Sequence, residues 1–552
     1  MSDTQPLIKS QRPPSIFQTG TLRESMGGGL HPLATLWQKP LFAPILFILI
    51  MVLGIVPRVW EFSKVPPGIN VDEASIGLEA YDLYHFGVDR NGDSFPVYFV
   101  SWGSGMDALE GYILIPFMVF GLTPVTVRLP ILLSGILTLP LLFFIAKKIW
   151  GINFALVSMF LLAISPWHII LSRWGHDENI VPFVFALGFA CVVLSTKANK
   201  WFIVSMVFFG LSLYAYAALY VAVPVFLACA IPILLKSKRV NVRDVLIGLV
   251  LITLLGFPLV IYVIINKWDL NTVRLGIFTI PRLPLDARFL VMTASSHNNF
   301  VLTMIKNAWA MIKLLFITQS DGNIWNVVDS YGYLYVFSFP FTIIGAFLLL
   351  LSYRVKQIPE KLLALAWLFA ALSIGLFQPV NINRIGLIFI PIILCTAAFL
   401  IWLGKQNKVI LVILTGIYLL SFTAFNLAYH GADYQKQASE PFAEGLLSAL
   451  KFADKAGNNP ICVTGNNRAP YIYVLFSEQK APSQYLDTIK YVYPNSISRN
   501  VISLGRYTFG LENCSKDPTT VYVLYQEQPP IVRGLSFNAY NYGIYHVYIP
   551  KK

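Results

Sequence analysis

The chain has 552 residues, of which 56% are hydrophobic and only 12% are charged, whereas a soluble globular protein carries roughly 25% charged residues. A soluble core cannot bury so much apolar surface, and this excludes a water-soluble globular protein. The formal net charge of +13 does not indicate nucleic-acid binding, because the basic residues form short clusters between apolar runs and do not follow one polar face.

The first 39 residues are polar and contain three consecutive glycines at 27–29, a composition that predicts a disordered tail. We expect this tail, residues 1–39, to be cytoplasmic. The apolar run that follows is predicted to remain as a first membrane span. Pro57, Arg58 and Trp60 come after it, in place of the small residues that mark a signal-peptide cleavage site.

Long apolar runs with few charged side chains continue along the chain, and roughly 20 such residues cross a bilayer as a helix. We predict eleven spans, near residues 40–57, 126–146, 152–166, 179–196, 201–217, 219–235, 244–266, 332–353, 361–377, 384–403 and 408–428. Together they form a membrane domain over residues 40–428. The segment 107–121 is short and carries Asp107 and Glu110, so it is predicted to be an interfacial or re-entrant helix.

Basic residues decide the orientation of these spans, because cytoplasmic loops of membrane proteins carry an excess of Lys and Arg. With the amino terminus inside, every strongly basic connection is cytoplasmic; these hold Lys147, Lys148, Lys197, Lys200, Lys236, Lys238, Arg239, Arg243, Arg354, Lys356, Lys361, Lys405 and Lys408. If 107–121 crossed the membrane, every later loop would change sides and the bias would be reversed. Four segments are therefore predicted to be extracytoplasmic: the first loop, 58–125, the connection 166–179, the loop from 267 to about 331, and the tail after 429.

The tail, residues 429–552, differs in character from the rest of the chain. A helical stretch at 440–456 is followed by β-rich runs, separated by turn signals, at 460–464, 471–476, 520–525 and 545–549. This pattern predicts a small α/β domain, and Cys462 and Cys514 within it are candidates for a disulfide. The predicted fold class is an α-helical polytopic membrane protein with a C-terminal extracytoplasmic α/β domain.

Three groups of polar residues are candidates for function, all on the predicted outer side. Asp72 and Glu73 follow the first span and open a predicted helix over 73–86. A carboxylate at a helix start is stabilised by unpaired amide donors, so Asp72 is either a helix N-cap or a functional group.

The other two groups lie at span boundaries. His176, Asp177 and Glu178 lie between two spans, where ionisable groups are costly unless they face a polar cavity; the alternative is ordinary interfacial and capping residues. Asn383 and Arg384 begin the span 384–403. An arginine on this side departs from the positive-inside trend and indicates an anionic partner, either a lipid phosphate or a structural carboxylate.

Several short motifs have a family-like pattern: Val71–Gly77, Gly87–Asp89, Asn91 and Gly92, Phe95–Val97, Val127–Pro130, Ser165–Ile169, Ser172 and Arg173, Tyr471–Phe476 and Gly505–Tyr507. With these motifs the chain resembles bacterial polyprenyl-phosphate-dependent glycosyltransferases, which belong with the protein O-mannosyltransferases and the aminoarabinose transferase of lipid A. The resemblance extends over about residues 40–552 and is specific in the first 180. It implies the GT-C architecture, with a catalytic aspartate in the first outer loop.

By this resemblance the catalytic aspartate corresponds to Asp72, with Glu73 beside it. Asp177 and Glu178 resemble the second acidic motif of the oligosaccharyltransferase catalytic subunit, which helps to hold a divalent metal. Asp72, Asp177 and Glu178 are thus the candidate ligands for Mg²⁺ or Mn²⁺, although related mannosyltransferases do not need a metal. One departure is that relatives carry Lys-Pro-Pro or His-Pro-Pro where this chain has Gly-Ser-Gly-Met-Asp-Ala at 103–108, so a basic residue that would grip the donor phosphate is missing.

These features predict an enzyme that moves a hexosyl or pentosyl group, with inversion, from a polyprenyl phosphate to an extracytoplasmic glycan, lipid or protein. A sugar leaving a phosphate needs no general acid, whereas the attacking hydroxyl needs a base. We expect Asp72 to be that base and Arg384, with Asn383, to stabilise the phosphate. Two alternatives are a lipid-linked sugar transporter, which predicts charges buried at mid-membrane, and a non-catalytic GT-C homologue. The expected partners are the lipid-linked sugar, membrane lipids and the acceptor.

Overall fold

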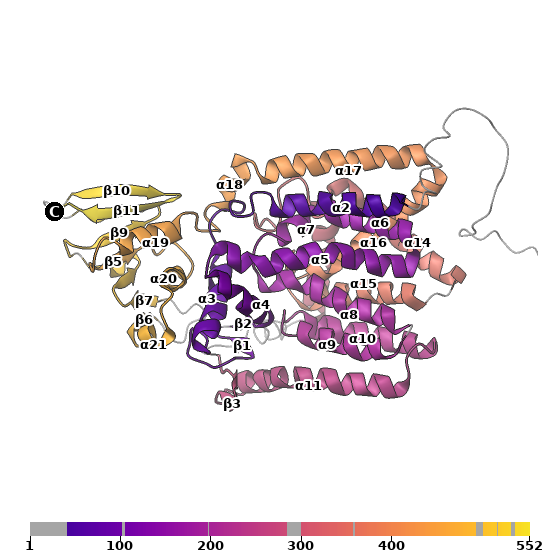
Figure 1. The fold of residues 1–552 in the computed structure, drawn as a ribbon, viewed down its shortest axis with the longest axis horizontal. Coiled ribbons are helices and arrows are strands. Elements are labelled where there is room, and N and C mark those ends of the chain that lie inside the picture. The colour runs from indigo at the N-terminus through magenta and orange to yellow at the C-terminus, as the bar shows by residue number, and fades with distance from the viewer. Residues whose placement is uncertain are drawn as a thin grey trace, which may run out of the picture.

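The computed structural model describes residues 41–101, 105–196, 198–283, 300–356, 359–492, 501–515, 517–531 and 536–551. The predicted tail, 1–39, lies outside these residues. The described chain forms a bundle of helices and a C-terminal domain, residues 430–551, which packs against one end of the bundle (Figure 1). We call this end of the bundle the domain end and the opposite end the basic end.

The bundle helices are α2 (Phe42–Val59), α5 (Pro124–Trp150), α6 (Ile152–Ile164), α8 (Val181–Ser195), α9 (Lys200–Ser212), α10 (Leu219–Lys236), α11 (Val242–Lys267), α14 (Phe339–Lys356), α15 (Pro359–Phe377), α16 (Phe389–Gln406) and α17 (Lys408–Tyr429). Each coincides with a predicted span. Within the described residues, nine helical segments are long and apolar enough to cross a membrane. The chain is therefore a multi-pass membrane protein.

One of those nine segments, Phe300–Thr318, was predicted to be part of an outer loop. It comprises α13 (Phe300–Ile312) and the π-helical turn η3 (Lys313–Thr318). Its contacts show that it lies across the end of α15. The ring of Phe300 faces that of Phe377, Asn307 donates to the carbonyl of Leu376, and Met311 lies against Gly375.

From the first of these contacts to the last, the chain advances by eleven residues along α13, from 300 to 311, but by only two along α15, from 377 to 375. Two helices that run side by side advance together, at about 1.5 Å per residue. α13 therefore crosses the domain end of α15.

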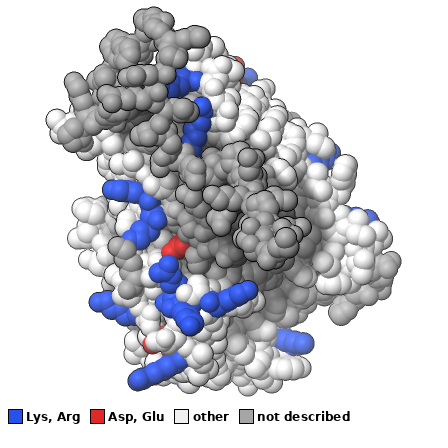
Figure 2. Space-filling model, turned by 90° about the vertical axis from the view of Figure 1, so that its right-hand side faces the viewer, with Lys and Arg blue, Asp and Glu red and all other residues white. Residues whose placement is uncertain are grey.

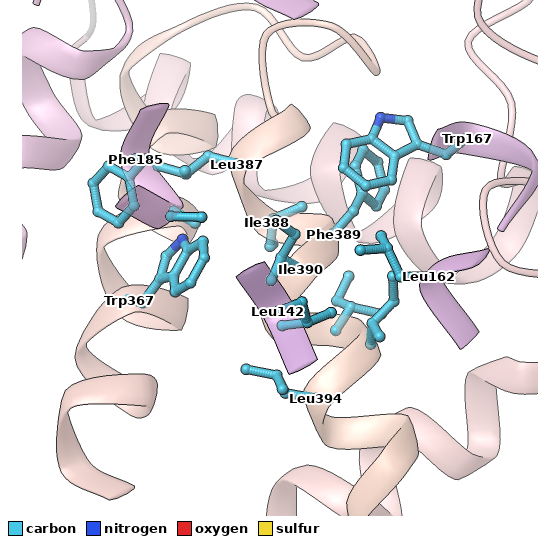
Figure 3. Close-up of a cluster of buried hydrophobic side chains, with 14 of the residues drawn as sticks. Leu142, Leu162, Trp167, Phe185, Trp367, Leu387, Ile388, Phe389, Ile390 and Leu394 are labelled. Atoms are coloured by element: carbon cyan, nitrogen blue, oxygen red, sulfur yellow. The ribbon is translucent and has the colours of Figure 1, made fainter. Parts of the chain in front are cut away.

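Aromatic and branched side chains fill the centre of the bundle (Figure 3). Trp367 of α15 packs against Phe185 of α8, with ring centroids 5.2 Å apart. Trp167, in the short helix α7 (Pro166–Leu171), packs against Phe389 of α16 at 4.8 Å. Both indoles are almost completely buried, and they fix α7, α8, α15 and α16 relative to one another.

Lys and Arg side chains gather on the face at the basic end, where acidic side chains are few (Figure 2). These side chains come from residues at or next to helix ends that lie close together at the basic end. They include Lys147, Lys148, Lys236, Arg239, Lys405 and Lys408. The helices alternate in direction, so the helix ends that flank the predicted basic, cytoplasmic connections lie at this one end in the described part of the chain. The C-terminal domain lies at the other end (Figure 1).

The first loop, 58–125, folds onto the domain end. It contains α3 (Val71–Phe86), a two-stranded ribbon of β1 (Tyr98–Phe99) and β2 (Met106–Asp107), α4 (Leu109–Leu114) and the 3-10 helix η1 (Ile115–Phe120). The segment that was predicted to be interfacial or re-entrant is thus broken into two six-residue helices, which pack on α3 and the start of α5. Neither is long enough to cross a bilayer.

The C-terminal domain is a seven-stranded sheet covered by helices. It comprises α18 (Ala432–Ala438), α19 (Leu446–Asp454), β5 (Ile461–Val463), α20 (Pro470–Glu478), α21 (Pro482–Tyr485), β6 (Ile489–Tyr491), β7 (Val501–Leu504), β8 (Tyr507–Phe509), β9 (Val521–Leu524), β10 (Phe537–Tyr542) and β11 (Tyr545–Pro550). The strand order is β10-β11-β9-β5-β8-β7-β6. β5 pairs in parallel with both β8 and β9, and the other pairs are antiparallel.

The prediction of a strand at 471–476 is wrong, because this segment forms α20. Its six side chains, Tyr471 to Phe476, are all buried. One side of α20 meets α19 and the sheet and another meets α3, so the run is apolar all round. Complete burial removes the periodicity that would have indicated a helix. The predicted helix at 440–456 is shortened to α19, which begins after Gly445 with its φ of +90°.

Candidate functional site

A cavity of about 570 Å³ lies where the domain end of the bundle meets the C-terminal domain. It is lined by Asn70, Val71, Asp72, Trp174, His176, Glu178, Asn323, Trp325, Asn381, Asn383, Arg384, Gln437, Glu440, Pro441, Ala443, Asn466, Asn467, Arg468 and Tyr473. The fold therefore brings Asp72, His176, Glu178, Asn383 and Arg384, five of the residues singled out in the sequence, to one cavity.

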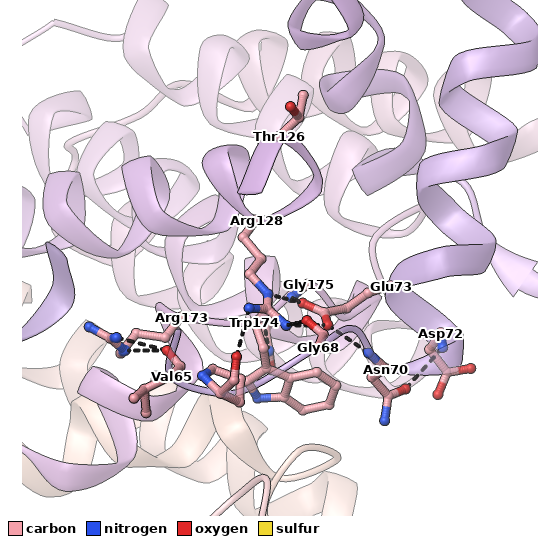
Figure 4. A network of polar contacts seen from close by, with 12 residues as sticks. Val65, Gly68, Asn70, Asp72, Glu73, Thr126, Arg128, Arg173, Trp174 and Gly175 are labelled. Carbon is pink, nitrogen blue, oxygen red and sulfur yellow. Dashed lines mark hydrogen bonds and ion pairs between the residues drawn. The ribbon is translucent and has the colours of Figure 1, made fainter. Parts of the chain in front are cut away.

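The start of α3 positions Asp72. The N-cap of this helix is Asn70, whose side chain accepts from the amide of Asp72 at 2.9 Å. Glu73 completes the capping box by accepting from the amide of Asn70 at 2.9 Å. The alternative in which Asp72 is the N-cap is therefore wrong. The carboxylate of Asp72 points away from the cap and from Glu73 (Figure 4), and it lines the cavity.

Glu73 has a different environment from its neighbour, since its side chain is fully buried. Arg128 of α5 donates to it from Nε at 2.7 Å and from Nη2 at 2.9 Å, and the amide of Gly175 donates at 2.8 Å (Figure 4). Glu73 thus ties α3, α5 and the loop before α8 together. It does not line the cavity, so the structure gives it a structural position, in contrast to the catalytic one expected from the sequence.

His176 lies among three carboxylates. Its Nδ1 is 2.9 Å from Asp177 Oδ1 and 3.9 Å from Glu178 Oε2, and its Nε2 is 3.9 Å from Asp72 Oδ2. Burial opposes a charge on the ring, but Asp177, Glu178 and Asp72 outweigh it and raise the pKa of His176 to about 10. The imidazole is therefore a cation at neutral pH.

The same geometry tests the metal that the resemblance implies. Mg²⁺ needs oxygen ligands that converge on one point about 2.1 Å away. Among the residues that the structure describes, no group of three His, Cys, Asp or Glu side chains is arranged to hold a metal ion. The candidate ligands Asp72, Asp177 and Glu178 instead surround the ring of His176. As placed, they do not fit a bound metal, and we assign no metal-dependent step to this chain.

Arg384 and Asn383 lie in the turn before α16, and both line the cavity. The amide of Arg384 donates to Asn381 Oδ1 at 2.7 Å, and one guanidinium nitrogen donates to the carbonyl of Pro379 at 3.2 Å. Asn383 donates to Asn179 Oδ1 at 3.3 Å, which joins this turn to the start of α8. Arg384 also interacts electrostatically with Glu178, which lines the same cavity.

Glu110 lies behind the 174–178 loop. It is fully buried, and neither of its carboxylate oxygens has a hydrogen-bond partner among the described residues. Burial, and then the charge of Asp177, raise the pKa of Glu110 to about 8. Glu110 is therefore neutral at pH 7 and adds no charge to the acidic group beside the cavity.

Sequence reasoning missed the part of the cavity that the C-terminal domain supplies. Asn466, Asn467 and Arg468 follow β5 directly, and Tyr473 lies in α20. A signal was present, because a run of polar residues after a buried parallel strand often marks a binding site in α/β sheets. Using that signal required knowing that β5 is parallel to its neighbours, which depends on long-range pairing.

Comparison with known proteins supports the resemblance over part of the chain. The family model of dolichyl-phosphate-mannose-protein mannosyltransferases matches residues 112–268. A curated protein of Bacillus subtilis (strain 168), named "Putative mannosyltransferase YycA", is 24% identical over 139 residues, which are 25% of this chain and 20% of that protein. The match thus spans about a fifth of the length of this relative.

Two solved structures extend the comparison. The archaeal oligosaccharyltransferase AglB from Archaeoglobus fulgidus, in complex with an inhibitory peptide and a dolichol-phosphate, has 12% identity and a TM-score of 0.48 over 80% of this chain and 64% of that chain, less than two thirds of its length. ArnT from Cupriavidus metallidurans, bound to undecaprenyl phosphate, has 12% identity and a TM-score of 0.52 over 93% of this chain and 98% of that chain. The likeness to ArnT confirms the predicted fold: the chain has the GT-C architecture, a helical membrane domain with a C-terminal sheet domain, and it is similar to the mannosyltransferase family over residues 112–268.

Proposed function

We propose that this chain is a glycosyltransferase that moves a sugar from a polyprenyl phosphate to the hydroxyl group of an acceptor. The observation that carries the proposal is the cavity at the domain end, where Asp72 and Arg384, more than 300 residues apart in the sequence, share one lining. The fold of ArnT and the match to the mannosyltransferase family over residues 112–268 support the same class of reaction.

In the proposed reaction, the acceptor oxygen attacks the anomeric carbon while the bond from that carbon to the phosphate oxygen breaks. The hydroxyl proton passes to the carboxylate of Asp72, and the bonding electrons leave with the phosphate. The guanidinium of Arg384 stabilises the negative charge that develops there, and Asn383 donates a hydrogen bond beside it. Direct displacement of this kind inverts the anomeric centre.

His176 has a positioning role in this scheme. Its charged ring lies 3.9 Å from Asp72 Oδ2 and is held by Asp177 at 2.9 Å. It therefore holds the carboxylate of Asp72 in position, as the supporting partner of a catalytic group does in many enzymes. Glu73 has no part in the chemistry, because its four hydrogen bonds are all used within the protein.

The distribution of Lys and Arg residues indicates on which side of the membrane the cavity lies. Lys and Arg cluster at the basic end (Figure 2), and short basic loops remain in the cytoplasm. We therefore infer that the cavity and the C-terminal domain are extracytoplasmic. A transporter would need its charged groups at mid-membrane, whereas Asp72, His176 and Glu178 lie at the domain end, where the C-terminal domain contributes to the same cavity.

The proposal is tested with purified protein in lipid nanodiscs, undecaprenyl-phosphate sugars and a membrane extract as acceptor source, with release of undecaprenyl phosphate as the readout. We expect Asp72→Asn to slow release by about 10²- to 10⁴-fold, the usual loss for a general base. Asp487→Asn is the matched control, because Asp487 is exposed and does not line the cavity. Equal release by Asp72→Asn and the wild type would overturn the assignment of the base.

A further inference from the structure

The cavity has two walls of different origin. The bundle and first loop contribute the carboxylates of Asp72 and Glu178 together with Arg384, whereas the C-terminal domain contributes Asn466, Asn467, Arg468 and Tyr473, and its first segment adds Gln437 and Glu440. The proposed reaction uses the first wall alone. The second wall faces the same space, so it is placed to bind the molecule that receives the sugar.

The second wall is built from the loop 465–469 after β5, which is rigidly held. Asn467 donates to the hydroxyl of Tyr545 at 2.7 Å, and this hydroxyl donates back to Asn467 Oδ1 at 3.0 Å. At the base of the loop, the hydroxyl of Thr464 donates to Glu527 at 2.6 Å, and a disulfide joins Cys462 of β5 to Cys514. A loop held at this many points is a preorganised binding surface.

The position of this loop in the sheet matches a known type of ligand site. Ligands of α/β sheets bind beyond the carboxyl ends of parallel strands, and the loop follows β5, which has parallel neighbours on both sides. Because β5 is paired on both edges, it offers no free edge at the cavity for an extended peptide, which commonly binds by adding a strand. The wall therefore favours an acceptor that is recognised by side chains.

The lining suits a saccharide. Seven of the nineteen lining residues carry a side-chain amide. The amides of Asn70 and Asn467 are bonded within the protein, and an amide that is not used in this way offers both donors and an acceptor to neighbouring hydroxyl groups. Trp174, Trp325 and Tyr473 add aromatic rings, whose apolar faces can cover the C–H face of a sugar ring.

The charged residues of the lining indicate the orientation of the acceptor in the cavity. The lining carries three carboxylates, those of Asp72, Glu178 and Glu440, and three cations, those of His176, Arg384 and Arg468. His176 and Arg384 belong to the first wall, so the exposed side chain of Arg468 is the cation that the second wall contributes. An anionic group on the acceptor is repelled by the carboxylates and binds at Arg468, since guanidinium pairs well with carboxylate and phosphate. The rest of the acceptor then extends toward Asp72, which places a hydroxyl near the base.

We propose that the loop 465–469 forms the acceptor subsite and that the acceptor is an anionic saccharide whose carboxylate or phosphate binds Arg468. This inference rests on the proposed function, in that it identifies the acceptor side of the same cavity.

The test measures binding to the full-length protein in nanodiscs by saturation-transfer NMR. The probes are cellobiouronic acid, cellobiose 6-phosphate, neutral cellobiose, a Ser/Thr-containing peptide and undecaprenyl phosphate. We expect the wild type to bind at least one anionic disaccharide more tightly than cellobiose, and the better of the two identifies the anionic group. Arg468→Gln is expected to weaken that binding by roughly tenfold or more, as for loss of a charge-assisted pair, with Arg468→Lys in between.

Two controls separate this inference from the proposed function. Lys490→Gln removes an exposed cation of the same domain outside the cavity and should bind every probe as the wild type does. Undecaprenyl phosphate should be insensitive to Arg468→Gln and weakened by Arg384→Gln; if it does not bind at all, the proposed function fails. If undecaprenyl phosphate binds but Arg468→Gln leaves the binding of the anionic disaccharides unchanged, the acceptor subsite is refuted. It is also refuted if, among the acceptor probes, the peptide alone binds.

Discussion

The division of roles between Asp72 and Glu73 gives the sharpest prediction. Removing Arg128, for example by Arg128→Met, leaves the Glu73 carboxylate in a fully buried position without its bidentate partner. Loss of one member of a buried pair typically costs about 3–5 kcal/mol of unfolding free energy. Glu73→Gln should cost a similar amount, because it leaves the Arg128 guanidinium uncompensated. Asp72→Asn, at a partly exposed site, should change stability by less than about 0.5 kcal/mol.

Equilibrium unfolding in mixed micelles, followed by tryptophan fluorescence, measures these changes. The double variant Glu73→Gln with Arg128→Met should be destabilised by clearly less than the sum of the two single variants, because neither charge is then left alone. Per folded molecule, transfer activity should persist in Glu73→Gln and be lost in Asp72→Asn. A Glu73→Gln protein of wild-type stability that has lost activity would refute this division of roles, as would strictly additive destabilisation.

Three other outcomes follow from the same structure. Burial raises the pKa of Asp82 to about 9, so the folded state holds a proton that the unfolded state releases near pH 4, and the unfolding free energy should fall as pH rises from about 5 to 9. The buried carboxyls of Glu79 and Glu110, with pKa values of about 8, act in the same direction, so Asp82→Asn should reduce the slope of that profile in unfolding measurements without removing it. Single cysteines at Lys480 and Lys148 should react differently with an impermeant maleimide in intact cells, the first at once and the second only after permeabilisation. Cys514→Ser should lower the unfolding free energy of the C-terminal domain by about 2–4 kcal/mol, measured against the wild type with and without reductant.

The bundle helices and the gathering of basic connections at one end were predictable from the sequence because they depend on local properties. Hydrophobic runs of sufficient length have few alternatives to a membrane helix, and basic connections identify one end of the bundle. The segment 300–318 shows the limit of this reasoning. It is as apolar as a span, and only its contacts with the end of α15, through Phe300 and Asn307, show that it crosses that helix.

The site was predictable to the extent that charged residues are costly at a membrane boundary. That cost marked His176, Asp177 and Glu178, of which His176 and Glu178 line the cavity and Asp177 does not. The predicted helix start marked Asp72, and the departure from the positive-inside trend marked Arg384; both line the cavity. These signals could not distinguish Asp72 from Glu73, since two adjacent carboxylates at a helix start look alike in a sequence. Their difference arises from Arg128, 55 residues away, which pairs with Glu73.

The capping of α3 explains how one carboxylate is left for chemistry. An exposed helix start needs acceptors for its amides, and here Asn70 and Glu73 supply them. Glu73 is further held by Arg128 and Gly175, and Gly175 begins the loop that carries His176. The same contacts that stabilise the helix start therefore fix the distance between Asp72 and the cation opposite it. Because the structural carboxylate binds both segments, Asp72 needs no role in folding and is available to accept a proton.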